Sequence, residues 1–546
     1  MISPPRGFRG TFRTDAAARA AYSEGAGPYR IVPAAVAIPE DRDDLALLVQ
    51  QARAELVPLV PRGAGSGMPG GNVGDGVLVD LGRFDRPLEI TAAEGAVVGA
   101  AVTWQALDAA AARHDLRFPP DPSSGAFCTM GGMVATNAAG ARSVRAGAVR
   151  RWVRSVELMT GDAEVTVLRR GEGAPSAPEA EVGPLQTRFA AIAQPLIRDS
   201  AGLIRARYPR TRKNSAGYAL DAYLETGDLL DLVIGSEGTL GFITRVEVQL
   251  EPRPPAVAGA LIGLTEMASL SDVIATLLRL GPSALELLDR SFLTVARAKT
   301  PFPLDGVEAV LLVDFEGTES AVRAAAAEAV QVTERHAAFA YPAMSAEDRA
   351  RMWALRHAAS PALANLPDGR RSLQLIEDGC VPVPALGAYL AEVRHVAAGL
   401  DVEIVAFGHA GDGHLHVNAL VDTTADDFER RVATLFERVT EIVIALGGTP
   451  SGEHGDGRLR SGAVGSLYGP EILAVLRRIK DAFDPDGILN PGVVLAPQDA
   501  EPIARLKVGR TVASIPTHVA AGLRHLERTG QWGTPKLELL TSGEER

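Results

Sequence analysis

Short apolar runs alternate with amphipathic stretches between residues 29 and 254. The apolar runs have the length of strands, and several lead into glycine-rich loops. The stretch that begins at residue 41 has helical spacing and starts with a cluster of acidic residues of the capping type. This texture predicts an α+β domain. Strand-like runs cover residues 31–38, 57–60, 76–81 and 97–102, and helices are predicted over residues 41–56 and 103–114.

The run Pro-Arg-Pro-Pro at residues 252–255 is the predicted domain boundary, because such a run neither continues a strand nor starts a helix easily. We therefore divide the chain into a first domain (29–253), a second α+β domain (254–497) and a C-terminal extension (498–546). The extension holds one amphipathic helix candidate, over residues 519–527. In the second domain we predict helices over residues 265–280 and 319–336 and strands over residues 309–315 and 403–407.

The composition, 46% hydrophobic and 22% charged, is that of an ordinary globular protein. A chain of 546 residues is longer than one core usually organises, which agrees with two or three domains. The net charge of −12 argues against a general nucleic-acid binder, because no excess of cations is present to neutralise phosphates. The only cysteines, Cys128 and Cys380, exclude a disulfide framework and a thiolate iron–sulfur cluster within the chain.

No apolar run approaches the roughly 20 residues that a membrane-spanning helix needs. Residues 1–27 contain Arg6, Arg9 and Arg13 but no apolar core, so they do not resemble a secretory signal. We expect no membrane span and a cytoplasmic location, with peripheral attachment to the membrane as the alternative.

A glycine-rich loop, Pro-Arg-Gly-Ala-Gly-Ser-Gly-Met-Pro-Gly-Gly-Asn, occupies residues 61–72 after a predicted strand. Its small residues leave backbone N–H groups uncovered, and such groups can wrap a pyrophosphate. The loop lacks Gly-Lys-Ser/Thr, so it is not a nucleotide-hydrolysing P-loop, and a Rossmann helix cannot follow its Met-Pro-Gly-Gly stretch. Taken alone, the loop leaves a phosphate cradle and a tight surface turn equally open.

Three further blocks follow the loop in a fixed order. They are Phe-Pro-Pro-Asp-Pro-Ser-Ser at 118–124, Cys-Thr-Met-Gly-Gly-Met-Val-Ala-Thr-Asn-Ala-Ala-Gly at 128–140, and Gly-Ser-Glu-Gly-Thr-Leu-Gly-Phe-Ile-Thr at 235–244. With these blocks the chain resembles the vanillyl-alcohol-oxidase-type FAD proteins, in particular the D-lactate dehydrogenase and glycolate-oxidase flavoprotein branch, over about residues 29–496. The resemblance implies an α+β fold: a two-part FAD-binding domain of the PCMH type, an α+β substrate or cap domain, and a short C-terminal extension.

The resemblance also implies which residues hold FAD. Glycines let the backbone touch the cofactor, while Thr and Asn supply directed hydrogen bonds. Some relatives tether the flavin through a histidine near the first loop, and residues 61–72 contain none, so we expect non-covalent FAD. Cys128 is interpreted as a packing residue. The predicted FAD contacts are Pro61, Arg62, Gly63, Ala64, Gly65, Ser66, Gly67, Gly70, Gly71, Pro120, Gly131, Gly132, Thr136, Asn137, Gly140, Glu237, Gly241 and Ile243, with Asn490 near the isoalloxazine.

Three of the ten histidines lie within the block Gly-His-Ala-Gly-Asp-Gly-His-Leu-His-Val-Asn at residues 408–418, and a fourth lies in Ser-Gly-Glu-His-Gly-Asp-Gly-Arg at residues 451–458. Imidazoles with one carboxylate suit zinc, manganese or iron(II), and an incompletely filled shell leaves a position for substrate. A set of hydrogen-bonded histidines in glycine turns explains the same pattern equally well.

These blocks resemble the C-terminal signature of the same branch, in which His409, His416 and Glu453 would hold a divalent metal (Zn, Mn or Fe) and His454 would be the general base. The branch more often has Asn where this chain has His414. That difference leaves open whether His414 joins the metal, faces the substrate together with Asn418, or is solvated.

The segment Met-Trp-Ala-Leu-Arg at 352–356 resembles the Trp-x-x-Arg segment of the branch. Arg356 is the predicted clamp for the substrate carboxylate, since its planar fork matches two carboxylate oxygens; a solvated helix arginine is the alternative. Relatives that act on dicarboxylates carry a lysine two residues before the position of Asp378, where this chain has Ile376. A monocarboxylate is therefore favoured.

The predicted function is FAD-dependent oxidation of a small D-2-hydroxy acid, D-lactate or glycolate, to the 2-oxo acid. Hydride passes to flavin N5, and electrons pass on to an acceptor other than NAD: a quinone, a cytochrome, an electron-transfer flavoprotein or an iron–sulfur partner. The alternatives are a flavin oxidase of an alcohol or aldose, a non-catalytic flavin subunit of an electron-transfer complex, and a binding protein for an anionic ligand. A homodimer is compatible with the sequence. The extension is predicted to pack on its own chain or on a partner.

Overall fold

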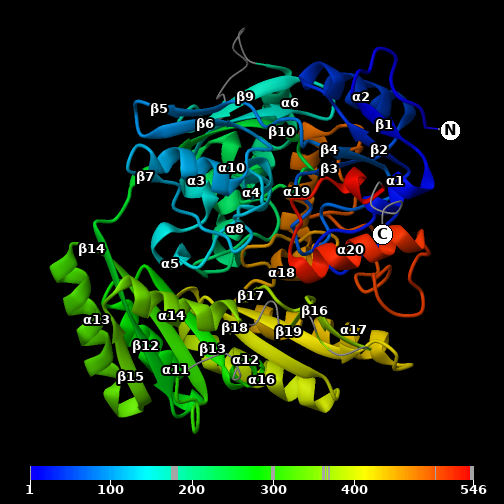
Figure 1. Ribbon diagram of the computed structural model, residues 1–546. Helices are drawn as coiled ribbons and strands as arrows, with labels where there is room; N and C mark the ends of the chain where they lie inside the picture. The colour runs from blue at the N-terminus through cyan, green and yellow to red at the C-terminus, as the bar shows by residue number, and fades with distance from the viewer. Residues whose placement is uncertain are drawn as a thin grey trace.

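The computed structural model describes residues 2–173, 183–296, 302–358, 363–364, 366, 369–498 and 500–540. Residue 499 and residues 541–546 of the predicted C-terminal extension lie outside the described residues. Figure 1 shows two lobes: the first domain above, and below it a lobe built on one large sheet. The α+β class that the sequence predicts is confirmed by this mixture of helices and mainly antiparallel sheets.

A small sheet in the first domain carries the glycine loop. Its order is β1 (Thr11–Arg13), β2 (Ala35–Ile38), β4 (Val77–Asp80) and β3 (Leu59–Arg62), and the last three strands run parallel. The crossover helix α2 (Arg42–Glu55) begins after Asp41, whose side chain accepts hydrogen bonds from the backbone N–H groups of Asp43 and Asp44. Because β3 ends at Arg62, the loop begins at the carboxyl end of a buried strand, where open α/β sheets bind ligands.

The second part of this domain is a five-stranded antiparallel sheet. Its order is β5 (Leu88–Thr91), β6 (Gly95–Gly99), β10 (Phe242–Gln249), β8 (Val153–Met159) and β9 (Val165–Arg169). Helix α3 (Trp104–Ala112) and helix α4 (Met130–Thr136) follow β6 in the chain. Thr103 caps α3 by accepting from the N–H of Ala106, so the helix predicted over residues 103–114 starts one residue later. The predicted division of the FAD-binding domain into two parts is thus confirmed.

An eight-stranded sheet, β15-β12-β14-β13-β18-β19-β16 with β17 paired to β19, forms the second domain. Helices α11, α13, α16 and α17 bury one face, while α12 and α14 pack on the other. Figure 1 places α14 between the sheet and the first domain. The strands are β12 (Ala256–Leu264), β13 (Ala284–Asp289), β14 (Ala309–Gly317), β15 (Ala337–Ala343), β16 (Arg370–Leu373), β17 (Gly379–Cys380), β18 (Glu403–Gly408) and β19 (His414–Asp422). The helices are α11 (Leu270–Leu278), α12 (Arg290–Ala296), α13 (Glu319–Thr333), α14 (Ala346–His357), α16 (Leu386–Gly399) and α17 (Phe428–Ala445).

The chain returns to the first domain before the boundary predicted at residue 497. Helices α18 (Ser461–Tyr468) and α19 (Pro470–Phe483) bury Ile472, Leu476 and Phe483 in the first core, and Leu59 of β3 donates its N–H to the carbonyl of Ile488. The sequence of α19 has amphipathic spacing, but that spacing does not show which core the helix packs against. Part of the chain that the sequence assigned to the second domain therefore packs in the core of the first domain.

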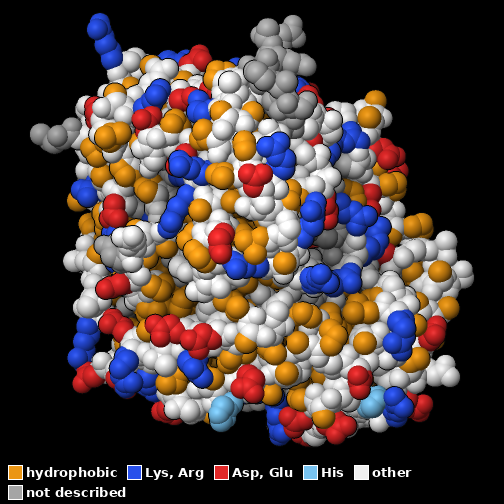
Figure 2. Space-filling model, turned by 180° about the vertical axis from the view of Figure 1, so that it is seen from behind, with side chains coloured by type: hydrophobic (Ala, Val, Ile, Leu, Met, Phe, Trp, Pro, Cys, Tyr) orange, Lys and Arg blue, Asp and Glu red, His pale blue; other side chains and the backbone are white. Residues whose placement is uncertain are grey.

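The C-terminal extension packs on its own chain. Helix α20 (Thr517–Thr529) buries Val519, Leu523 and Leu526 against α1 (Ala16–Ala21) and the parallel sheet. Figure 1 shows this contact between the last helix, in red, and the first residues, in blue. In Figure 2 basic and acidic side chains alternate over one face, and one group of Lys and Arg gathers around a hollow despite the net negative charge. No helix among the described residues combines the length and apolarity needed to cross a bilayer.

Candidate active site

A cavity of about 1620 Å³ lies between the two domains. Pockets for drug-sized ligands measure roughly 300–1000 Å³, so this larger space has room for a dinucleotide and a small second ligand. Its walls come from the glycine loop, the segments around residues 121–142 and 237–243, helix α14, and the histidine block. The cavity therefore brings together the motifs for which the sequence predicted separate roles.

The glycine loop fits a phosphate-bearing cofactor because its glycines have no room for side chains. Gly65 has φ +78°, and a Cβ there would lie 2.4 Å from Nη2 of Arg62. A Cβ on Gly63 would lie 2.5 Å from Oγ1 of Thr129, on the facing segment. The Arg62 guanidinium is buried and donates to the carbonyl oxygens of Tyr22 and Glu24. The Arg62 side chain thus fixes the start of the loop through these hydrogen bonds, and Arg62 also lines the cavity.

Most of the predicted FAD contacts line the cavity: residues 61–67, Gly71, Gly131, Gly132, Thr136, Gly140, Glu237, Gly241 and Ile243. Four others support these residues from outside the lining. Asn490 donates from Nδ2 to the carbonyls of Gly71 and Glu237, and Asn137 accepts the N–H of Arg150. The carbonyl of Pro120 accepts from Trp104, and Gly70 packs on the Tyr29 ring. Direct contact of these four with FAD stays a prediction that their placement does not favour.

The histidine block is a β-hairpin, and three of its side chains, His409, His416 and Asn418, line the cavity. β18 ends at Gly408, and Gly413, with φ +71°, completes the turn into β19. Alternation along β19 places His414, His416 and Asn418 on one face of the strand. The period-two spacing of these residues was visible in the sequence; what it could not show was that their face of the sheet borders the cavity.

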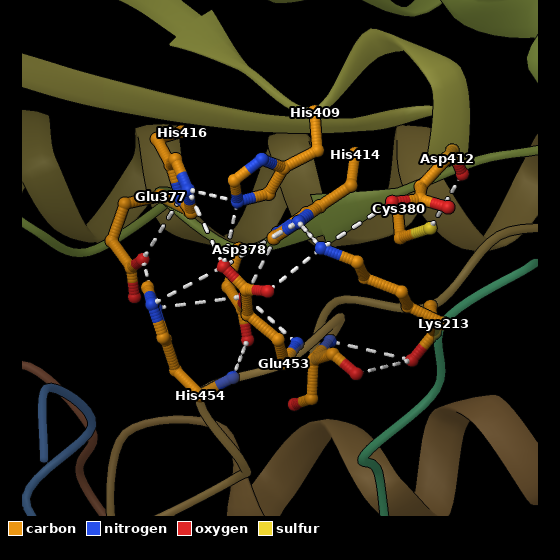
Figure 3. A network of polar contacts seen from close by, with 12 residues as sticks. Lys213, Glu377, Asp378, Cys380, His409, Asp412, His414, His416, Glu453 and His454 are labelled. Atoms are coloured by element: carbon orange, nitrogen blue, oxygen red, sulfur yellow. Dashed lines mark hydrogen bonds and ion pairs between the residues drawn. The ribbon is translucent and has the colours of Figure 1, made fainter. Parts of the chain in front are cut away.

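Two imidazoles and one carboxylate meet at distances that fit a metal site. Nε2 of His409 lies 3.0 Å from Oε1 of Glu453 and 3.3 Å from Nε2 of His416. His416 Nδ1 lies 2.9 Å from the carbonyl oxygen of Glu377; since a carbonyl only accepts, Nδ1 carries the proton and the Nε2 lone pair faces the cluster. Figure 3 shows these side chains converging. The residues present fit a cation with N,N,O ligands, as Zn, Mn and Fe(II) accept.

His414 is fully buried and lies outside the cavity lining. Its Nε2 is 2.9 Å from Oδ1 of Asp378, and its Nδ1 is 3.4 Å from the ammonium of Lys213. Burial, with Lys213 as the next cause, lowers the pKa of His414, so the neutral ring donates to Asp378 and accepts from Lys213. Both nitrogens are therefore engaged. His414 does not line the cavity, so its contact with substrate stays a prediction that this placement does not favour.

His454 stands at the edge of the cluster with 27% of its side chain exposed, and it lines the cavity. Its Nδ1 is 2.5 Å from Oε2 of Glu377, so Nδ1–H donates and Nε2 is left to accept a proton. Burial lowers its pKa, but the carboxylates of Glu377 and Asp378 outweigh burial and raise the pKa to about 9. A cation at the neighbouring site would favour the neutral ring that a base requires.

Arg356 reaches the cavity from α14. Its Nε donates to Oε2 of Glu286 at 2.8 Å, and its guanidinium lies 4.6 Å from the centre of the Phe407 ring. Glu286 also accepts from Nδ1 of His409, so one carboxylate orients both residues. The alternative that Arg356 is a solvated helix arginine does not agree with its 12% exposure.

Sequence reasoning missed five charged residues that hold the cluster in place: Lys213, Glu286, Glu377, Asp378 and Arg460. The ammonium of Lys213 is 2.7 Å from Oε2 of Glu453. Arg460, fully buried, donates to Glu377 and Asp378. Lysine is scarce in this chain, so the presence of Lys213 in the segment Lys-Asn-Ser-Ala-Gly-Tyr was a sequence signal for a specific role of this residue.

Glu237 connects the flavin loops with the turn that carries His454. It has φ +53°, a conformation that non-glycine residues seldom adopt, and its Oε1 accepts the N–H groups of Asp456 and Gly457. Burial, followed by the charge of Asp456, raises the pKa of Glu237 to about 8. Its carboxyl therefore fixes residues 455–457 against the cavity wall.

Comparisons with known proteins agree with this geometry. Residues 33–169 match the FAD binding domain family, and residues 253–494 match the family of FAD linked oxidases, C-terminal domain. The chain is 30% identical to the glycolate oxidase subunit GlcD of Bacillus subtilis, covering 88% of this chain and 93% of that protein. It is 29% identical to a D-lactate dehydrogenase of Archaeoglobus fulgidus (84% and 90% covered) and to a D-2-hydroxyglutarate dehydrogenase of Xanthomonas citri (86% and 90%).

Among solved structures, 4-ethylphenol oxidase from Gulosibacter chungangensis superposes with a TM-score of 0.63 at 17% identity, covering 90% of this chain and 95% of that one. The p-cresol methylhydroxylase structure gives a TM-score of 0.62 at 13% identity, with the same coverage. At these identities the likeness establishes the fold alone, and it confirms the PCMH-type architecture.

Proposed function

Because this chain belongs to the FAD-linked oxidase family, we propose that it oxidises a small D-2-hydroxy acid to the 2-oxo acid with non-covalently bound FAD. The observation that carries the proposal is the meeting, in one cavity, of the glycine loops, the Arg356 guanidinium and the cluster His409, His416 and Glu453. The relatives reported above bear the names of enzymes for glycolate, D-lactate and D-2-hydroxyglutarate, all of them 2-hydroxy acids.

D-Lactate and glycolate are the favoured substrates. The family resemblance implies that relatives acting on dicarboxylates carry a lysine at the position of Ile376. Here the Ile376 side chain is buried in the apolar core of the second domain, so it offers no charge for a second carboxylate. Arg356 then supplies the positive charge for the one carboxylate of the substrate, with Phe407 stacked on its guanidinium.

The chain's own residues bind the acid and move its proton. When bound, FAD supplies the acceptor for the α-hydrogen as hydride, and a cation on the cluster supplies a Lewis acid beside the hydroxyl. Arg356 and Asn418 orient the carboxylate, and both line the cavity. His454 Nε2 accepts the hydroxyl proton while Glu377 holds Nδ1, which fixes the ring for proton transfer. An acceptor other than NAD would take up the electrons that bound FAD supplies.

The test is the flavin absorbance of the purified protein under anaerobic conditions, before and after addition of D-lactate, L-lactate or glycolate. Bleaching by D-lactate or glycolate, with L-lactate inert, is the expected result. A yellow protein that none of these acids bleaches would discard them as substrates and point to a larger hydroxy acid or to an accessory flavin subunit. A colourless protein that gains no flavin on incubation with FAD would overturn the proposal.

A further inference from the structure

The C-terminal extension forms part of the wall of the active-site cavity. Lys507, Arg524 and Arg528 line the same cavity as His409 and Glu453. The match to the C-terminal oxidase domain ends at residue 494, so these three basic residues lie beyond the family-matched part of the chain. The mechanism proposed above assigns them no role.

The first part of the extension is tied to the segment that precedes the glycine loop. Leu506 pairs with Tyr29 in an antiparallel bridge, and the N–H of Lys507 donates to the carbonyl of Pro28 at 2.7 Å. The Tyr29 hydroxyl donates to the carbonyl of Pro502, and the Tyr29 ring packs on Gly70 of the loop. These contacts place the extension beside the loop that is predicted to hold FAD.

Helix α20 presents its arginines on the side opposite its buried face. Val519, Leu523 and Leu526 are buried, whereas Arg524 and Arg528 are exposed and lie four positions apart on one side of the helix. Like charges at this spacing destabilise a helix slightly. Neither arginine forms an ion pair with a carboxylate in the part of the chain that the structure describes. Figure 1 shows α20 lying between the first domain and strand β16.

Strand β16 contributes a third arginine to this end of the cavity. Arg371 lines the cavity next to Ser372. Glu527, the acidic residue between the arginines of α20, pairs with Lys507 at 2.7 Å. Burial acts against the charged form of Glu527, but Lys507, Arg371 and Arg528 lower its pKa, so all three cations are near it. One carboxylate therefore faces three basic residues, and the excess charge is positive.

We propose that Arg371, Arg524 and Arg528 form a basic entrance that captures the carboxylate of the incoming hydroxy acid and guides it toward Arg356. The proposal rests on the proposed function for the identity of the anion. Clefts lined by one sign of charge focus the field and raise the local concentration of the oppositely charged ligand. Such an entrance matters in this protein because its net charge of −12 would otherwise repel an anionic substrate.

The experiment compares two double variants of the full-length flavoprotein with the same change in net charge. R524E/R528E reverses the entrance. R198E/R205E is the matched control, because these exposed arginines of α7 (Gln194–Asp199) and α8 (Ala201–Arg207) do not line the cavity. Stopped-flow reduction by D-lactate gives the apparent Kd and the limiting rate. Titration with oxalate, an anion without an oxidisable hydrogen, gives a Kd from the flavin spectrum even if D-lactate is not a substrate.

At low ionic strength R524E/R528E should raise the Kd of oxalate and of D-lactate by about tenfold or more relative to the control, with the limiting rate within about twofold. In 1 M salt, where the Debye length is about 3 Å, most of this difference should vanish. The Kd values of R524Q/R528Q should lie between those of wild type and R524E/R528E. This variant replaces R524E/R528E in the comparison if the glutamate variant fails to hold FAD.

Equal Kd values for oxalate in R524E/R528E and the control at low salt would overturn the proposal. So would slower flavin reoxidation by a protein acceptor with unchanged oxalate binding, because the arginines would then dock an acidic partner. If D-lactate reduces neither wild type nor variant while oxalate discriminates between them, the entrance stands and the choice of D-lactate fails.

Discussion

The ammonium nitrogen of Lys213 lies 2.7 Å from Oε2 of Glu453, although the two residues are 240 positions apart in the chain. Oε1 of the same carboxylate faces Nε2 of His409 at 3.0 Å. Lys213 therefore occupies one oxygen of Glu453 and leaves the other for the cluster. Burial penalises both charges, and the pair offsets this cost only while both partners are present.

Replacing Lys213 by Met should weaken cation binding at the cluster by about 10- to 100-fold, as loss of an orienting partner usually does. The measurement is the Kd for Mn²⁺ or Zn²⁺ by competition with a chelator, together with the metal content per flavin. Lys213→Arg, which keeps the charge, should retain most of the affinity. Wild-type affinity in the methionine variant would show that Lys213 does not orient Glu453.

Replacing His454 by Gln should slow flavin reduction by about 10²- to 10⁴-fold, because the proposed general base is lost. FAD content should stay unchanged, since His454 contacts Glu377 and not the glycine loops. Glu377→Gln should give a smaller loss, because it only misorients the ring. Single-turnover reduction by the active hydroxy acid measures both effects, and an unimpaired His454→Gln rate would remove this residue from the base role.

Arg356→Lys should weaken substrate binding while leaving the fold intact. A lysine keeps a positive charge beside Glu286 but loses the planar fork that matches a carboxylate. A charge-assisted hydrogen bond is worth about 1.5–3 kcal/mol, so the apparent Kd should rise by roughly 10- to 150-fold. Arg356→Ala should in addition lower thermal stability, because it leaves the buried Glu286 with one cationic partner fewer. Unchanged affinity in both variants would place the carboxylate clamp elsewhere.

Gly65→Ala should yield a protein that retains little flavin. The residue has φ +78°, and the new Cβ would meet the buried Arg62 guanidinium at 2.4 Å, so the loop must shift. Gly202→Ala is the matched control, because a Cβ there meets nothing within 4 Å. The ratio of flavin to protein after gel filtration distinguishes the two variants. Equal ratios would argue against the loop as the cradle for FAD.

Docking of the C-terminal extension should strengthen as the pH rises above 7. Burial, and then the nearby charge of Arg62, lowers the pKa of Lys536 to about 7 from its ordinary value of 10.5. Between these values the undocked lysine binds a proton that the docked one lacks, so docking gains up to about 1.4 kcal/mol per pH unit. Hydrogen exchange of α20 at pH 7 and pH 9 measures this, and Lys536→Met should remove the dependence. A methionine variant with the same pH response would assign it to another group.

The sequence by itself determined the local pieces of this protein and their chemistry. Strand and helix periodicity predicted β14, β18, α2, α3 and α13 close to their observed bounds, because burial of one face imposes a period that the chain must carry. The glycine blocks carried the family resemblance that implied FAD, and glycine is the residue that lets the backbone approach a cofactor closely. The histidine pattern indicated candidate ligands, since imidazole and carboxylate are the groups that suit such cations.

Tertiary structure alone decided which distant residues complete the site. Lys213 belongs to the first domain and Glu453 to the second, so their contact depends on how two cores pack and not on any local period. The same packing buries His414, with one ring nitrogen against Asp378 and the other against Lys213. It also places α19 in the first core and Arg524 in the wall of the cavity. A sequence pattern reports the face that an element buries; the partner of that face follows only from the folded chain.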